Sequence, residues 1–203
     1  MKIAINALPI QQLWGSSAES YLCGLLPELL RLEPNIEFVV FLRSDTDWPA
    51  ELDSPNLRLH RLRVFGPTAA RIAVEQLQLP SHCREFDLLF CPYNTAPRWA
   101  PVPCVLYLHT FLWFTHPQLC PATRNFFFRR LVPASVARAA AVLCPSQATA
   151  QDIAHHLTVE PERLHVVPHG YAPLFRPGVQ SGDSDLLRQM GVTRPYILSV
   201  TSI

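Results

Sequence analysis

The sequence Lys2-Ile-Ala-Ile-Asn-Ala7 is a short and nearly continuous apolar run. Such a run is typical of a strand that is buried on both faces, as the strands of a parallel sheet are. Similar strand signals recur along the chain. They lie at Glu37–Leu42, Leu57–Leu62, Leu88–Cys91, Val102–Leu108, Ala141–Cys144 and Leu164–Val167.

Helical patterns lie between several of these strands. Leucines at helical spacing follow Tyr21, and further amphipathic stretches begin after the N-cap candidates Thr68 and Ser146. Strands that alternate with helices indicate βαβ units. The sequence therefore predicts the α/β class, with a Rossmann-like parallel sheet and helices on both of its faces. The predicted helices are Tyr21–Leu30, Ala69–Leu79, Ala122–Ala140 and Gln147–Leu157.

The composition of the chain changes after Val167. Residues 171–183 are rich in proline, glycine and polar residues, which is typical of a linker. A short helix at Asp185–Met190 and an apolar strand at Tyr196–Val200 follow. We expect a first domain over 1–170, a linker over 171–183 and the start of a second domain over 184–203. Because a last strand without a following helix is an unfinished βαβ unit, we expect the second domain to be truncated.

Composition excludes several classes of protein. The 203 residues carry 17 Lys and Arg against 16 Asp and Glu, so nucleic acid is not an expected partner. The six cysteines form no C-x-x-C pair and the eight histidines show no H-E-x-x-H spacing, so we expect neither a metal site nor a redox dithiol. Free thiols favour a reducing, cytoplasmic location. The longest apolar window, Val102–Phe114, is too short to cross a bilayer.

Ligands of open α/β sheets bind outside the carboxyl ends of the strands, and this rule selects four places. Gly15 fits either an ordinary turn or a phosphate contact through backbone N–H groups. His109 follows an apolar strand and fits either a structural histidine or a hydrogen bond to a sugar hydroxyl. For Ser146 an N-cap role is preferred, because no G-x-S-x-G motif surrounds it. For His169-Gly170 a turn or hinge is preferred over lining of a cleft.

The run Phe126-Phe-Phe-Arg-Arg130 combines aromatic and basic residues, with Arg124 and Arg138 nearby. Two interpretations stay open. In the preferred one the aromatic side chains pack in the core. In the other the run forms an amphipathic face that makes peripheral contact with a membrane.

Several segments occur in the order found in a known family. Gly15 with Tyr21 is similar to a glycine loop and its helix, and Pro92-Tyr-Asn-Thr-Ala-Pro97 leading to His109 is similar to a "P-x-x-x-x-P, strand, His-Asp" stretch. Ser146–Ile153 is similar to "Val-Ser-Glu-x-Ser-x-x-Asp-Leu", and Pro161–Pro177 is similar to "Lys-Ile-x-Val-Val-Pro-Asn-Gly-Val-Asp…Phe-x-Pro". The chain thus resembles the N-terminal, acceptor-side domain of the family-four retaining glycosyltransferases of the GT-B fold, in which two Rossmann-like domains face each other across a cleft.

The resemblance implies an enzyme that transfers a sugar from a nucleotide-diphosphate donor to a hydroxyl, with retention of configuration and without a metal or other cofactor. It implies a sugar, polysaccharide or lipid-linked acceptor, and a cytoplasmic location that includes the inner face of the membrane. His109 is then the catalytic residue, in contact with the donor sugar, and the backbone at Gly15 and Ser16 faces the diphosphate. The other implied substrate-binding residues are Asn94, Thr110, Ser146, His169 and Gly170.

The sequence departs from the family pattern at several positions. Thr110 stands where the family has Asp, and His169 stands where it has Asn. In the family, the second domain holds the nucleotide-sugar with a basic residue and two glutamates. These are not found in these 203 residues. We therefore expect the chain alone to be inactive.

Two other functions stay open. A non-catalytic Rossmann-like module would act as a binding or partner subunit that completes its cleft with another chain. A nicotinamide-dependent enzyme is the weaker alternative, because the chain lacks the G-x-G-x-x-G fingerprint and a clear acidic partner after the second strand.

Overall fold

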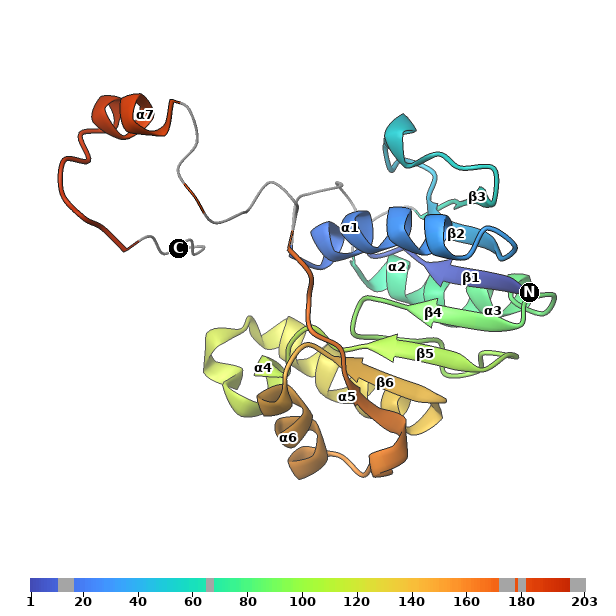
Figure 1. The fold of residues 1–203 in the computed structure, drawn as a ribbon. Helices are drawn as coiled ribbons and strands as arrows, with labels where there is room; N and C mark the ends of the chain where they lie inside the picture. Colours follow the sequence, from blue (N-terminus) through green and yellow to red (C-terminus); the bar gives the residue numbers. More distant parts are fainter. Residues whose placement is uncertain (11–16, 65–67, 172–177, 179–181, 198–203) are drawn as a thin grey trace. The chain divides into compact units, whose positions relative to one another are not determined.

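The computed structural model describes residues 1–10, 17–64, 68–171, 178 and 182–197. It separates into two compact units, Met1–Gly170 and Tyr171–Ile203. The first unit is built on a seven-stranded parallel sheet of order β3-β2-β1-β4-β5-β6-β7 (Figure 1). The strands are β1 (Lys2–Asn6), β2 (Glu37–Arg43), β3 (Leu57–Leu62), β4 (Leu88–Cys91), β5 (Cys104–Tyr107), β6 (Ala141–Cys144) and β7 (Leu164–Val166).

Burial on both faces explains why the strand sequences are apolar without alternation. In β1, Ala4 belongs to the core on one face of the sheet and Ile5 belongs to the core on the other face. At the edge of the sheet, β3 instead exposes Arg58 and Arg61, as expected for a strand with one free side. The predicted parallel sheet is confirmed.

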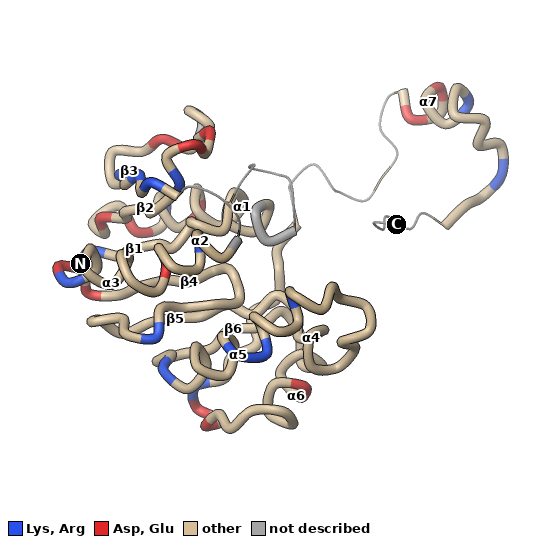
Figure 2. Tube along the Cα trace, turned by 180° about the vertical axis from the view of Figure 1, so that it is seen from behind, with Lys and Arg blue, Asp and Glu red and all other residues tan. Residues whose placement is uncertain are grey.

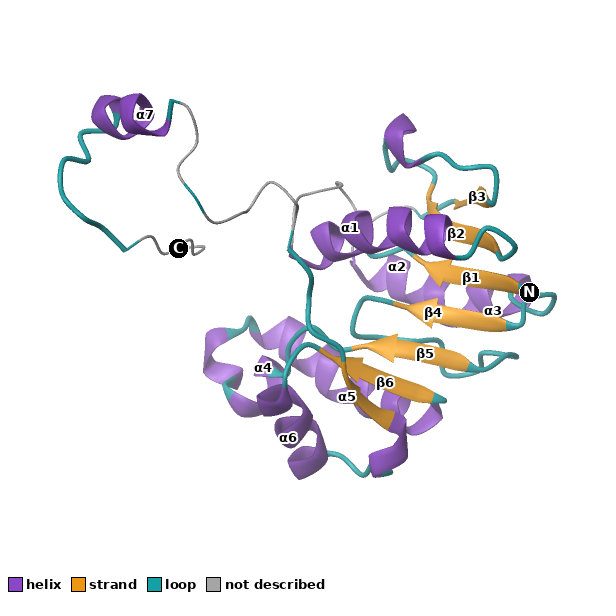
Figure 3. Cartoon of the chain, viewed as in Figure 1, coloured by secondary structure: helices purple, strands orange, loops and turns teal. Residues whose placement is uncertain are grey.

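Helices cover both faces of this sheet. On one face α1 (Ser17–Leu32) packs Leu22 and Leu26 against the core, and on the other face α3 (Leu79–His82) and α5 (Ala122–Arg138) contribute Leu79 and Val132 (Figure 3). This confirms the predicted α/β class with helices on both faces. The helices are α1 (Ser17–Leu32), α2 (Thr68–Ala73), the π-helical turn η2 (Val74–Gln78), α3 (Leu79–His82), α4 (Leu112–Thr115), α5 (Ala122–Arg138) and α6 (Gln147–His156), with 3-10 turns η1 (Ala50–Leu52), η3 (Pro117–Leu119) and η4 (Pro161–Arg163).

The second unit contains the short helix α7 (Asp183–Gln189), where a helix is predicted. Tyr196 and Ile197 lie outside any strand, so the predicted strand is wrong at these two residues, and 198–203 are outside the described part of the chain. A strand needs a hydrogen-bonded neighbouring strand, and among the described residues no strand pairs with Tyr196 or Ile197. Residues 172–177 and 179–181 of the predicted linker are also outside the described residues.

Candidate functional site

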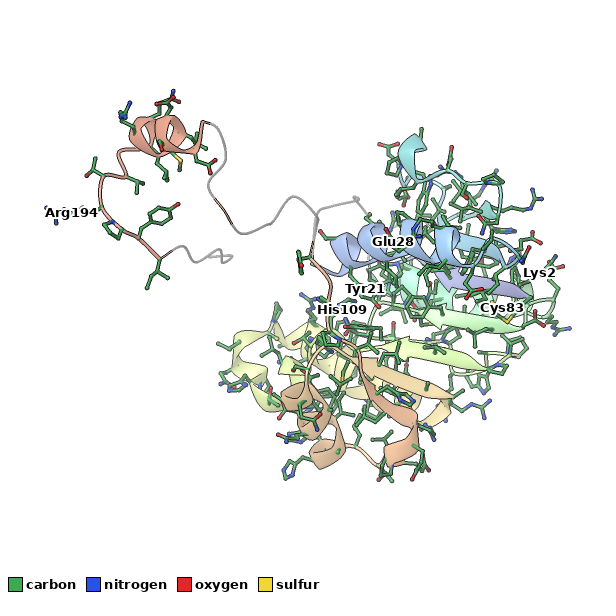
Figure 4. All side chains as sticks on the ribbon, in the orientation of Figure 1. Lys2, Tyr21, Glu28, Cys83, His109 and Arg194 are labelled. Carbon is green, nitrogen blue, oxygen red and sulfur yellow. The ribbon has the colours of Figure 1, made fainter. Side chains whose placement is uncertain are left out.

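Four aromatic rings meet at the carboxyl edge of the sheet, and we call them the His109 cluster. Tyr21 comes from α1, Tyr107 ends β5, His109 lies in the loop after β5, and His169 follows β7. The ring centroid of His109 lies 5.1 Å from that of Tyr21, 4.7 Å from that of Tyr107 and 5.2 Å from that of His169. Figure 4 shows Tyr21 and His109 side by side. Residues that are far apart in the sequence therefore converge where the fold predicts a ligand.

The imidazole of His109 is held in one orientation. Its backbone N–H donates to Oδ1 of Asn94 at 2.8 Å, and its Nε2 lies 2.6 Å from the carbonyl oxygen of Pro92. Because a carbonyl oxygen only accepts hydrogen bonds, Nε2 carries the proton and Nδ1 carries a lone pair. Nδ1 is buried and has no hydrogen-bond partner among the described residues. The ring therefore holds one unused, buried acceptor near the carboxyl ends of the strands.

The rings of the cluster are uncharged at neutral pH. The pKa of His109 is lowered to about 4, chiefly by burial and also by the neighbouring His169, against the opposing effect of the hydrogen bond to Pro92. Burial also lowers the pKa of His169 and raises the pKa of Tyr21 to about 12. A neutral cluster with one free acceptor is suited to a hydroxyl group rather than to an anion.

Asn94 and Tyr107 join the segments that carry the cluster. Asn94 adopts a φ of 64°, a left-handed conformation that asparagine tolerates better than most residues, and its N–H donates to the carbonyl oxygen of Tyr107 at 3.0 Å. The hydroxyl of Tyr107 donates to the carbonyl oxygen of Val167 at 2.8 Å. These bonds tie the loop after β4, the end of β5 and the segment after β7 to one another.

The other predicted site residues have local structural roles or stay untested. Oγ of Ser146 accepts from the N–H of Thr149 at 3.2 Å, which confirms the N-cap of α6. Oγ1 of Thr110 accepts from the N–H of Leu112 at 3.3 Å. Gly170 is exposed, and a Cβ there would meet nothing within 4 Å. Gly15 and Ser16 lie outside the described residues.

Sequence reasoning does not identify Tyr107 as a member of the site. The available signal is a hydroxyl-bearing residue near the end of an otherwise apolar strand, since a buried tyrosine hydroxyl needs a hydrogen-bond partner. That partner is a backbone carbonyl from a distant segment, and no sequence pattern encodes it.

A hollow with a volume of about 450 Å³ lies at the amino end of the strands, away from the His109 cluster. It includes Glu37, which pairs with Lys2 at 3.6 Å and with Arg58 at 2.9 Å. Because ligands of open α/β sheets bind outside the carboxyl ends of the strands and this hollow lies at their amino ends, the His109 cluster is the stronger candidate site. Within the described ranges, no group of three or more His, Cys, Asp or Glu side chains is arranged to hold a metal ion. In the same ranges, no helix is long and apolar enough to cross a membrane.

A sequence model of Glycosyltransferase Family 4 matches residues 18–173, a range that includes the whole His109 cluster. The chain belongs to this family. This Family 4 chain is similar in fold to HepE from Anabaena in complex with UDP and glucose, with 18% identity and a TM-score of 0.61 over 94% of this chain and 50% of HepE. It is also similar to UGT89C1 from Arabidopsis thaliana complexed with quercetin, with 12% identity and a TM-score of 0.53 over 96% of this chain and 55% of that one.

The Family 4 chain thus spans about half the length of these solved neighbours. The predicted resemblance to family-four glycosyltransferases of the GT-B fold is confirmed. No curated protein matches the chain.

Proposed function

We propose that the chain is the acceptor-side half of a glycosyltransferase that moves a sugar from a nucleotide-diphosphate donor to a hydroxyl, with retention of configuration and without a metal. The match of residues 18–173 to Glycosyltransferase Family 4 carries this proposal. UDP and glucose in the HepE complex support a nucleotide-sugar as the donor. The acceptor is a sugar, a polysaccharide or a lipid-linked sugar. Residues 184–203 are the start of the donor-binding domain.

In this function, Nδ1 of His109 accepts a hydrogen bond from a hydroxyl of the donor sugar, while the bond from Nε2 to Pro92 fixes the ring. The lowered pKa keeps the imidazole neutral at pH 7, so that the acceptor lone pair is available. The rings of Tyr21 and His169, 5.0 Å apart, provide the apolar surface against which a sugar ring packs. Gly15 and Ser16 contact the diphosphate through their backbone.

The solved neighbours contain a second half that this chain does not cover, and we propose that turnover requires its equivalent. A half-site offers few of the contacts that offset the entropy of association. We therefore expect a dissociation constant for UDP-glucose no tighter than about 1 mM, or about −4 kcal/mol.

The test is an NMR titration of the histidine-labelled chain with UDP-glucose. The imidazole signals of His109 and His169 should shift, and those of His60 and His82, which line the hollow at the amino end of the strands, should not. His109→Gln should weaken binding at least about fivefold, about 1 kcal/mol, whereas the control variant of the exposed His116, His116→Ala, should leave it unchanged. Shifts confined to His60 and His82 would exclude the carboxyl edge as the donor site.

The same titration separates the proposal from the alternatives. Micromolar binding without turnover would favour a self-sufficient, non-catalytic binding module. Robust transfer by these residues alone, measured as UDP release with sugar acceptors present, would show that the second half is not required.

A further inference from the structure

Basic and acidic residues are segregated along the chain. Between Asp87 and Asp152 there are five arginines and no Asp or Glu, whereas the rest of the chain has 12 Lys and Arg against 16 Asp and Glu. Four of the five arginines belong to α5 (Ala122–Arg138). Figure 2 accordingly shows positive segments on α5 and no negative segment on α4 or α5. A chain with a net charge of +1 therefore has one strongly basic helix.

Apolar side chains are exposed beside these arginines. Phe126 of α5 is 58% exposed and Leu119 of η3 is 68% exposed. The amide of Asn125 donates to the carbonyl oxygen of Pro117 at 2.6 Å, which holds η3 against α5. An exposed phenylalanine on a basic helix, with an exposed leucine nearby, is the composition of an interfacial face.

For the run Phe126–Arg130, the preferred interpretation is that the aromatic side chains pack in the core. This is confirmed for Phe128 and wrong for Phe126. Phe128 stacks on the buried Trp113, with 3.9 Å between ring centroids. A helix has 3.6 residues per turn, so three consecutive phenylalanines do not all face the same core. Phe126 is left on the solvent side.

The arginines of this region lie over aromatic rings rather than beside carboxylates. The guanidinium carbon of Arg130 lies 5.0 Å from the ring centroid of Phe126, and that of Arg124 lies 5.7 Å from the ring centroid of Phe128. In the part of the chain that the structure describes, neither arginine forms an ion pair. Their charges therefore remain available to an external anion.

We propose that this region, the α5 face, docks on an anionic membrane surface. Guanidinium groups bind lipid phosphates, while the exposed apolar side chains enter the boundary between headgroups and acyl chains. Charge complementarity selects an anionic partner, and the two exposed apolar side chains select a lipid over a nucleic acid. This inference does not depend on the proposed function. Taken with that function, docking would place the sheet at the membrane surface, where a lipid-linked acceptor would lie. The α5 face consists of Leu119, Phe126, Arg129 and Arg130.

The test is flotation of the full chain with vesicles of phosphatidylcholine alone and with about one third phosphatidylglycerol. The chain should bind the anionic vesicles, should bind neutral vesicles at least about tenfold more weakly, and should be released by about 0.5 M salt. Arg129→Gln and Arg130→Gln should each weaken binding about fivefold, and Phe126→Ser should weaken it about tenfold.

The matched controls lie on α1, which packs on the opposite face of the sheet. Arg31→Gln and Leu32→Ser change an exposed arginine and an exposed leucine, and should alter binding less than about twofold. The side chains changed in these two controls and in the three variants of α5 are all exposed, so all five variants should keep the melting temperature of the parent chain.

Three results would overturn the proposal. The first is equal binding, or none, to the two kinds of vesicle. The second is a dimer of the chain that Phe126→Ser dissociates, because the face would then be covered by a second copy. The third is binding to duplex DNA that persists where vesicle binding is absent.

Discussion

The hydroxyl of Thr95 donates to the fully buried carboxylate of Glu75, with 2.8 Å between Oγ1 and Oε1. The same carboxylate pairs with Arg71 at 2.5 Å. Thr95 directly follows Asn94, whose side chain accepts from the N–H of His109. A buried ion pair on α2 and η2 therefore fixes the loop that positions the imidazole of the candidate site.

Glu75→Ala should lower the free energy of unfolding by about 3 to 5 kcal/mol, because it leaves the guanidinium of Arg71 buried without its partner. Urea denaturation measures the loss. Replacing both residues together, by Arg71→Leu and Glu75→Leu, should cost less than Glu75→Ala alone, since no unpaired charge remains.

The control for this pair is the exposed ion pair of Arg31 with Glu28. Glu28→Ala should cost less than about 1 kcal/mol, because water already solvates both charges. A loss of about 1 kcal/mol or less for Glu75→Ala would mean that the buried pair does not support the loop.

Asn94 combines a left-handed backbone with a side chain that accepts a hydrogen bond, and two substitutions separate these properties. Asn94→Gly keeps the backbone conformation but leaves the N–H of His109 without its acceptor, at a cost of about 1 to 3 kcal/mol. Asn94→Ala should cost about 1 kcal/mol more, since alanine is strained at positive φ. Thermal unfolding of the two variants measures the difference, and equal losses would assign the whole effect to the side chain.

The sheet was predictable because burial on both faces leaves a strong mark on the sequence. Residues 38–42 and 88–91 are pure apolar runs, and the strands that contain them, β2 and β4, lie within one residue of their expected limits. The helix expected over Ala69–Leu79 was less predictable, since it is interrupted by η2. The π-helical turn buries Glu75, whereas propensities describe an acidic residue in a helix as exposed.

The candidate site was predictable only in part. The rule for open sheets places His109 and His169 at one edge, and the structure brings their rings to 5.2 Å. The tautomer of His109 depends on the carbonyl of Pro92, and a backbone carbonyl has no sequence signature. Ser146 belongs to the predicted substrate-binding residues, but local spacing already favours its N-cap role.

Ser146→Ala should lower the free energy of unfolding by about 1 kcal/mol, because α6 loses the oxygen that accepts from Thr149. Ser146→Asp should keep most of the stability, since aspartate is an equally good N-cap. Denaturation in urea checks both variants. A weakening of UDP-glucose binding by Ser146→Ala, at unchanged stability, would instead return Ser146 to the substrate-binding residues.

The last prediction concerns the pH dependence of His109. Its pKa is lowered from 6.5 to about 4 in the folded chain, so the unfolded chain takes up a proton that the folded chain does not. Stability from this residue is therefore complete above a pH of about 6.5 and is lost as the pH falls toward about 4. His109→Gln removes the titration, so the variant should lose less stability than the parent chain between pH 7 and 4.5, measured in urea.

His169→Gln should raise the pKa of His109, because it removes the second imidazole. An NMR titration measures this pKa, and an unchanged value would assign the shift to burial alone.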